Sequence, residues 1–197
     1  MSIEIQKLSV ELVNDWLGYF DHDCGDWPGC YCMCYHWNSG YSARYDWNTE
    51  VFRKWDGSSE VHNRHRAVDL IKQGIMQGYL AYYDGVVIGW CNANDRSMYN
   101  STLFQLPKAG NNEKVKSVVC FSVAPAFRNK GIATALLKKL CLDAATDGYD
   151  YVEAYPFTYG EHNNYHGSTS LYLRNGFDIC GEINSSIGCC TIVRKQV

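Results

Sequence analysis

Several features that define functional classes are missing from this sequence of 197 residues. It has no apolar run that approaches the ~20 residues of a membrane helix. The amino-terminal stretch MSIEIQKLSVELVNDW is interrupted by charged residues, so we expect no secretion signal. The formal net charge of -3 gives no electrostatic reason to expect nucleic acid or an anionic membrane as a partner. We therefore expect a cytoplasmic protein that binds neither.

Repeats, low-complexity tracts and obvious linkers are also absent. Hydrophobic residues make up 46% of the chain and charged residues 20%, which is an ordinary globular composition. A chain of this length can bury a sizeable core by itself. We therefore expect a single domain over residues 1–197.

The ten cysteines do not change this expectation. In a small secreted protein an even number of cysteines would indicate a disulfide framework, but this chain shows no secretion signal. Cys91, Cys120, Cys141 and Cys180 lie in apolar segments, where free cysteine behaves as a small hydrophobic residue. Reduced thiols are therefore favoured over disulfides.

Hydrophobic periodicity and turn residues predict the order of the elements. Ser9 and Ser58 or Ser59 are placed to cap helices, and Asp84-Gly85 joins two apolar runs into a hairpin. The predicted strands are 2–8, the hairpin 79–93, 114–125, 149–156, 176–184 and 187–196, and the predicted helices are 9–20, one from 58 or 59 to about 75, 131–146 and 167–175. This order indicates a mixed α/β sheet with helices packed against it.

The stretch FRNKGIATALLKKL at residues 127–140 places a glycine turn before a strongly patterned helix. The first turn of that helix faces the carboxyl end of the preceding strand, where unpaired N–H groups and the helix dipole favour an anion. Gly131 lets a phosphate approach the backbone, and Arg128 and Lys130 add positive charge. The spacing matches neither a P-loop nor G-x-G-x-x-G.

The turn does match R-x-x-G-x-A, preceded by V-A-P and followed by ALLKKL. This pattern resembles the acetyl-CoA-binding motif of the GNAT superfamily of N-acetyltransferases. A second stretch, GSTSLYLRNGF at 167–177, resembles the later family helix that ends in Y-x-x-x-G-F, here Tyr172, Gly176 and Phe177. The resemblance covers residues 79–183 and implies a single-domain fold with a splayed central sheet flanked by helices.

The resemblance further implies acetyl-CoA as the acyl donor and no metal. The pantetheine arm would pair with main-chain groups at Phe121 and Val123, and an N–H of that strand would stabilise the oxyanion. Tyr172 would protonate the leaving thiolate as general acid, the alternative being a core tyrosine. The other positions matched to the donor site are Arg128, Asn129, Lys130, Gly131, Ile132, Ala133, Thr134 and Ser168.

The general base is less well defined. An amine acceptor must lose a proton before it attacks, and family members commonly use a carboxylate on the fourth or fifth strand. Glu153 on the predicted strand 149–156 is the candidate, with a partly exposed strand glutamate as the alternative, and Asp95 is weaker. Tyr165 replaces a family asparagine that contacts the donor. Because apolar neighbours would raise the pKa of Cys120, we expect direct transfer without an acyl-cysteine.

The acceptor side is expected at the irregular, aromatic- and cysteine-rich segment of about 21–57. Its aromatic lining suits an apolar or cationic acceptor, although large side chains can equally serve to fix a long irregular segment. Cys32 and Trp37 of this segment, with Tyr155, are the candidate acceptor-binding residues. The acceptor would be a small-molecule amine or a peptide or protein amino group.

The run CGDWPGCYCMCYHW contains Cys30, Cys32 and Cys34, which would share one face of a strand. It lacks C-x-x-C spacing, so a zinc site completed by Cys24, His22 or His36 is disfavoured. Three hypotheses follow: a GNAT N-acetyltransferase, a non-catalytic CoA-binding sensor, and a thiol or metal module at 22–36. The sequence leaves a homodimer open.

Overall fold

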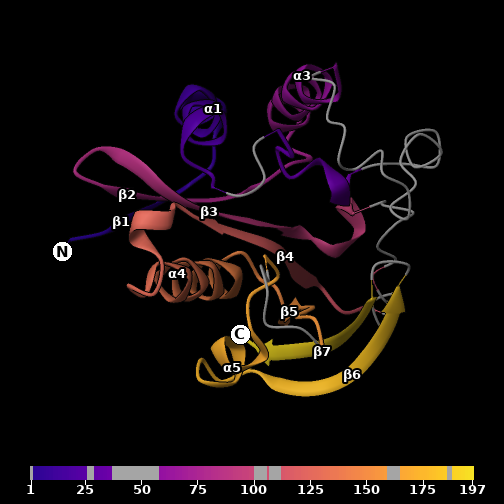
Figure 1. Ribbon diagram of the computed structural model, residues 1–197. Coiled ribbons are helices and arrows are strands. Elements are labelled where there is room, and N and C mark those ends of the chain that lie inside the picture. Colours follow the sequence, from indigo (N-terminus) through magenta and orange to yellow (C-terminus); the bar gives the residue numbers. More distant parts are fainter. Residues whose placement is uncertain are drawn as a thin grey trace.

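The computed structural model describes residues 2–25, 29–36, 58–99, 106, 112–158, 165–185 and 188–197, the side chains of 58–62 and 185 excepted. This part of the chain forms a seven-stranded mixed sheet with helices on both faces (Figure 1). The strands are β1 (Glu4–Lys7), β2 (Gly78–Tyr83), β3 (Val86–Asp95), β4 (Val115–Val123), β5 (Tyr151–Ala154), β6 (Asp178–Ser185) and β7 (Gly188–Gln196). The helices are α1 (Val13–His22), α3 (Ser58–Lys72), α4 (Ile132–Thr146) and α5 (Thr169–Leu173).

The strands lie in the order β1-β2-β3-β4-β5-β7-β6. Neighbours pair antiparallel except β4 and β5, which are parallel and are connected by α4. A parallel pair needs such a crossover because the chain must return to the same end of the sheet. The predicted mixed α/β fold is therefore confirmed.

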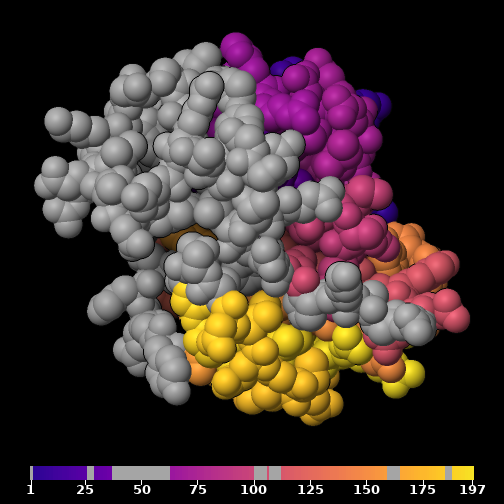
Figure 2. Space-filling view, turned by 90° about the vertical axis from the view of Figure 1, so that its right-hand side faces the viewer, coloured from indigo at the N-terminus to yellow at the C-terminus, as the bar shows by residue number. Residues whose placement is uncertain are grey.

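The helices divide between the two faces of the sheet. Figure 1 places α1 and α3 on one face and α4 and α5 on the other. In the view of Figure 2, α3 lies at the top of the molecule and the β6–β7 hairpin at the bottom.

Each face has its own apolar core. Under α4 the predicted helix face is buried, with Leu136, Leu137 and Leu140 all 0% exposed; each such leucine contributes about 2 kcal/mol of transfer free energy. On the other face Trp16 of α1 packs edge-on against Trp90 of β3, with ring centroids 6.0 Å apart. The sheet is thus covered on both sides.

Local backbone geometry shifts some predicted boundaries. Ser9 makes no side-chain cap, because a 3-10 turn, Val10–Leu12, precedes α1. Ser168 is the residue that caps α5, accepting a hydrogen bond from Leu171 N, and Gly167 before it has φ +77, which a helix does not allow. The hairpin turns at Asp84-Gly85 as predicted.

The cysteine run is not a strand. Tyr31 and Cys32 have φ values of 44 and 48 and are followed by a 3-10 turn, Met33–Tyr35. Two successive left-handed residues other than glycine reverse the chain direction, so Cys30, Cys32 and Cys34 cannot line one strand face. The idea of a shared cysteine face is therefore wrong.

Candidate active site

β4 and β5 separate part-way along their length. They pair from Val115 to Val118 against Tyr151 to Ala154, whereas β4 continues to Val123. On its other edge β4 stays paired with β3 through a register shift at Asn92/Ala93. The carboxyl half of β4 therefore presents its β5-side backbone groups to whatever enters the gap.

A cleft of about 640 Å³ opens along this half of β4 and reaches the start of α4 and α5. All of the predicted donor-binding residues except Lys130 line it. Five further residues complete the lining: Phe127, Tyr165, Gly167, Leu171 and Arg174. Stretches far apart in sequence thus meet at one elongated surface.

The turn before α4 has the geometry of an anion site. Gly131 is the N-cap with φ 82, and Asn129 has φ 60. The first i to i−4 bond of the helix runs from Ala135 N to Gly131 O, so the N–H groups of the first turn have no acceptor within the helix. Their dipoles and the helix dipole point into the cleft and favour a phosphate.

A glycine in β3 lets α4 come close to the sheet at this end. A Cβ on Gly89 would lie 2.9 Å from Ile132 Cγ2 and 3.3 Å from the Ser122 carbonyl. Only a residue without a side chain leaves room for Ile132 there. The close packing fixes the first turn of α4 relative to β4.

The two basic residues of the turn are directed differently. Arg128 Nε donates to the Val123 carbonyl at 3.1 Å, and a Cβ on Gly25 would lie 2.6 Å from Arg128 Nη2. Arg128 therefore lies along the β4 edge toward the end of α1. Lys130 Nζ lies over the Phe127 ring, 5.4 Å from its centroid, and Lys130 is not part of the cleft wall.

Tyr172 lies directly behind the cleft wall. It is 0% exposed, and its hydroxyl donates to the His166 carbonyl at 2.6 Å. A Cβ on Gly167, which lines the cleft, would be 3.2 Å from that hydroxyl oxygen. Burial raises the pKa of Tyr172 well above its usual value, so the hydroxyl keeps its proton at neutral pH.

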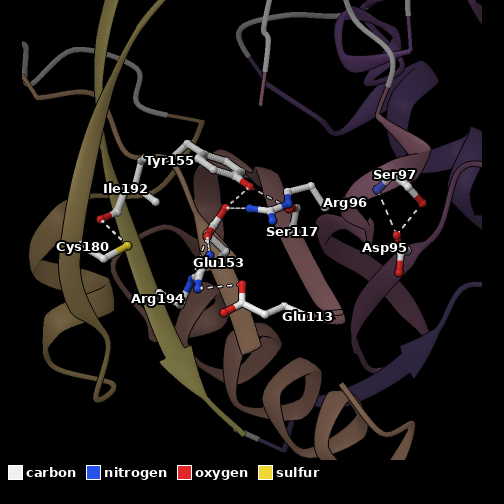
Figure 3. A network of polar contacts seen from close by, with 10 residues as sticks. All are labelled: Asp95, Arg96, Ser97, Glu113, Ser117, Glu153, Tyr155, Cys180, Ile192 and Arg194. Atoms are coloured by element: carbon white, nitrogen blue, oxygen red, sulfur yellow. Dashed lines mark hydrogen bonds and ion pairs between the residues drawn. The ribbon is translucent and has the colours of Figure 1, made fainter. Parts of the chain in front are cut away.

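Glu153 lies on the α1 and α3 face of the sheet in a buried network (Figure 3). It is 1% exposed. Its Oε1 accepts from Arg96 Nη1 and from the Tyr155 hydroxyl, both at 2.7 Å. Its Oε2 accepts from Arg194 Nε at 2.8 Å and pairs with Arg194 Nη2 at 2.7 Å.

These four donors occupy the carboxylate on all sides. A general base must offer a lone pair to the acceptor's proton, and Glu153 has none to spare in this arrangement. The base role remains a prediction, and these contacts weigh against it. The weaker candidate, Asp95, accepts from Ser97 N and Ser97 Oγ, at 2.9 and 2.6 Å, as the cap of a 3-10 turn.

The predicted acceptor residues lie on the same face. Tyr155 is 0% exposed and its hydroxyl also contacts Ser117 Oγ at 2.7 Å. Cys32 is 1% exposed and accepts from Trp90 Nε1 at 3.2 Å. Trp37 lies outside the described residues. Both described side chains are thus buried below the surface of the acceptor side.

The cysteines beside β4 are inert thiols. Burial raises the pKa of Cys32 well above its usual value. The pKa of Cys120 is raised as well: the hydrogen bond with Cys32 lowers it, but burial and the neighbouring thiols outweigh that effect. All ten cysteines are free thiols in the structure. Protonated, buried thiols are poor nucleophiles.

The described residues contain neither a metal centre nor a membrane-spanning helix. No group of three or more His, Cys, Asp or Glu side chains in that part of the chain is arranged to hold a metal ion. Among the helices that the structure describes, none combines the length and the apolar character needed to span a bilayer.

The sequence matches a family model described as "Acetyltransferase (GNAT) family" over residues 40–177. The chain belongs to this family. It is an acetyltransferase, and the expected family is confirmed. The match includes both quoted motifs, from the turn of α4 to Phe177. No curated protein matches the chain in sequence.

Solved structures of acetyltransferases have a similar fold. PaiA N-acetyltransferase from Thermoplasma acidophilum, in complex with coenzyme A, has 18% identity and a TM-score of 0.55, with 100% of both chains covered. Aminoglycoside acetyltransferase AAC(6')-Ib, in complex with coenzyme A, has 11% identity and a TM-score of 0.61, with 99% of this chain and 95% of that chain covered. A chain of the NatC complex bound to Gag peptide and CoA has 12% identity and a TM-score of 0.56, with coverage of 100% and 99%.

Sequence reasoning missed several residues around this acetyltransferase site. Arg96 and Arg194 meet Glu153 only through strand order, and Arg174 reaches the cleft from the end of α5. His166 and Tyr35 join the acceptor side to α5 through a hydrogen bond of 3.0 Å. The sequence signal for Arg96 is its place directly after Asp95, at the end of the predicted hairpin.

Proposed function

We propose that this GNAT protein transfers the acetyl group of acetyl-CoA to a primary amine by direct attack in a ternary complex. The acceptor is a small-molecule amine or a peptide or protein amino group. Structural neighbours crystallised with coenzyme A support the donor, and neighbours named for aminoglycoside and peptide ligands support an amine acceptor. The one observation on which the proposal depends most is the cleft that joins the open edge of β4 to the first turn of α4.

Each part of the donor has a matching surface in that cleft. The pyrophosphate is assigned to the N–H groups of the Gly131 turn, and the pantetheine arm to the β4 edge at Phe121 and Val123. The Phe121 N–H faces the gap, because its acceptor in the structure is the Tyr165 carbonyl. We assign it to the thioester oxygen, whose negative charge grows as the amine attacks.

The chemistry needs two protons removed from the acceptor's ammonium nitrogen and one supplied to the leaving sulfur. The amine nitrogen forms a bond to the carbonyl carbon, the C–S bond breaks, and the thiolate takes a proton. Tyr172 is assigned as the donor of that proton, since it is buried, protonated and adjacent to the cleft. The ammonium proton leaves to solvent before attack, and the second proton that the nitrogen loses as the amide forms restores the Tyr172 hydroxyl. No acyl-cysteine takes part, because Cys120 is a buried thiol of raised pKa.

Calorimetric titration of acetyl-CoA into wild-type protein and Gly131→Asp tests the donor site. The variant places a carboxylate among the N–H groups that the phosphates need, so we expect at least about a 100-fold weaker affinity, from like-charge repulsion in the anion site. Gly148→Asp is the matched control, because Gly148 has φ +76 and, like Gly131, nothing within 4 Å of an added Cβ. It lies beyond the opposite end of α4 and should bind as wild type does.

An amine panel with detection of released CoA thiol then tests turnover. Binding without release of thiol by any amine or peptide would favour the sensor hypothesis. Failure of folded wild-type protein to bind acetyl-CoA, or equal loss in both glycine variants, would overturn the assignment of the turn.

A further inference from the structure

Two successive carbonyls hold the two groups that the proposed reaction uses as donors. The Tyr165 carbonyl accepts from Phe121 N at 2.5 Å. The next carbonyl, that of His166, accepts from the Tyr172 hydroxyl at 2.6 Å. The first donor is the N–H assigned to the thioester oxygen, and the second is the hydroxyl assigned to the leaving thiolate.

The side chain of His166 fixes the position of this peptide. His166 is 4% exposed, and its Nε2 is 3.0 Å from the Tyr35 hydroxyl. Its ring meets the Phe157 ring edge-on, with centroids 4.5 Å apart, and the Tyr35 ring at 5.7 Å. Because burial lowers the pKa of His166 to about 4, the ring is neutral at pH 7, and a neutral hydrogen bond joins its Nε2 to the Tyr35 hydroxyl.

We propose that His166 is a positioning residue, whose ring holds the Tyr165 carbonyl on the Phe121 N–H and the His166 carbonyl on the Tyr172 hydroxyl. The acyl donor must displace both carbonyls to reach these two groups. This inference rests on the proposed function. A thioester oxygen accepts from the same N–H as an amide oxygen does, so the peptide and the donor compete for one place. Tyr35 comes from the acceptor-side segment, and its hydrogen bond therefore links donor binding to that segment.

Competition of this kind sets the apparent affinity for the donor. If acetyl-CoA binds only when the peptide has moved, its apparent affinity is reduced by the fraction of molecules in that state. The Tyr35–His166 hydrogen bond stabilises the other state. A neutral buried hydrogen bond is worth about 1 kcal/mol, so removing it should increase the competent fraction by about fivefold.

The test is acetyl-CoA titration of Tyr35→Phe, which removes one hydroxyl and leaves the ring. We expect Kd for acetyl-CoA, and KM in turnover with a saturating amine, to fall by about fivefold relative to wild type. Tyr31→Phe is the matched control, because Tyr31 lies in the same segment and is also buried, at 1% exposed. Its hydroxyl donates a hydrogen bond to Asp21 Oδ1 at 2.7 Å and not to His166. It should leave Kd unchanged.

A second variant distinguishes the loss of this hydrogen bond from a general loss of stability. His166→Leu removes the same hydrogen bond from the other side, together with the ring contact to Phe157. Its Kd should also fall, and adding Tyr35→Phe to it should change Kd by much less than fivefold, since the hydrogen bond is already gone. A structural defect alone does not tighten binding. Equal or weaker affinity in Tyr35→Phe would overturn the inference while leaving the proposed function intact, whereas no binding by wild type would overturn both.

Discussion

The carboxylate of Glu153 is shared by two arginines, so its main role is to stabilise the fold. Arg96 and Arg194 place two positive charges on one buried Glu153, and Arg194 also contacts Glu113 Oε2 at 3.2 Å. Removing a charged partner from such a site leaves the other charges uncompensated in the interior, which is costly. The same contacts leave it poorly suited to accept a proton.

Glu153→Gln should therefore lower the free energy of unfolding by about 3 kcal/mol or more, because the buried Arg96 guanidinium loses its counter-charge. Urea denaturation measures this. Glu113→Gln is the control: the Glu113 side chain is 32% exposed, so its loss should cost less than about 1 kcal/mol. A Glu153→Gln protein of normal stability that loses the acidic limb of its pH–rate profile would instead restore the base role.

At the scale of elements, the splay of β4 from β5 and the close approach of α4 make the site. β5 is short, Tyr151–Ala154, and residues 156–158 continue along β7 and not along β4, so among the described residues β4 has no partner strand on this edge beyond Val118. The first turn of α4 is brought to that edge by packing of Ile132 on Gly89. No single side chain creates the cleft; the relative placement of two strands and one helix does.

The glycine inside α1 gives a prediction at the same scale. Gly18 lies in the middle of Val13–His22, and an added Cβ would meet nothing within 4 Å. Gly18→Ala should raise the free energy of unfolding by about 1 kcal/mol, because alanine loses less backbone entropy in a helix. Gly78→Ala is the contrast: its Cβ would lie 2.0 Å from the Cys91 carbonyl, so it should destabilise the β2–β3 pair. Thermal melts of both variants measure the two effects.

For the molecule as a whole, the buried His166 makes the free energy of unfolding depend on pH. The pKa of His166 is about 4 in the folded protein because burial disfavours the charged form, and near ~6.5 in the unfolded chain. Between these values the unfolded state binds more protons, so stability is full above pH ~6.5 and falls as the pH is lowered.

His166 should account for a slope of up to about 1.4 kcal/mol per pH unit between pH 6.5 and 4. Urea melts at pH 7, 6 and 5 measure it, and His166→Asn should be less stable at pH 7 but show a flatter dependence. His65→Asn, at an exposed position of α3, is the control and should keep the wild-type slope. An unchanged slope in His166→Asn would contradict the assignment.

Features written in short stretches of chain were predictable from the sequence. The apolar runs of β2 and β3, the period of 3.6 in α4, the Asp84-Gly85 turn and the Gly131 turn each depend on residues within a few positions of one another. Both family motifs are also local. Such patterns determine which element forms and which of its faces is buried, and through them the sequence specified the mixed α/β fold and the donor turn.

Tertiary structure alone decided which distant side chains meet. Arg96 and Glu153 are 57 residues apart in sequence, and Tyr35 and His166 are 131 apart. Their contacts depend on strand order, on the register shift between β3 and β4, and on the left-handed pair at Tyr31 and Cys32 that no periodicity indicates. A charged or aromatic residue in the sequence does not indicate which residue it will contact, because that contact forms only when the tertiary structure buries both groups together.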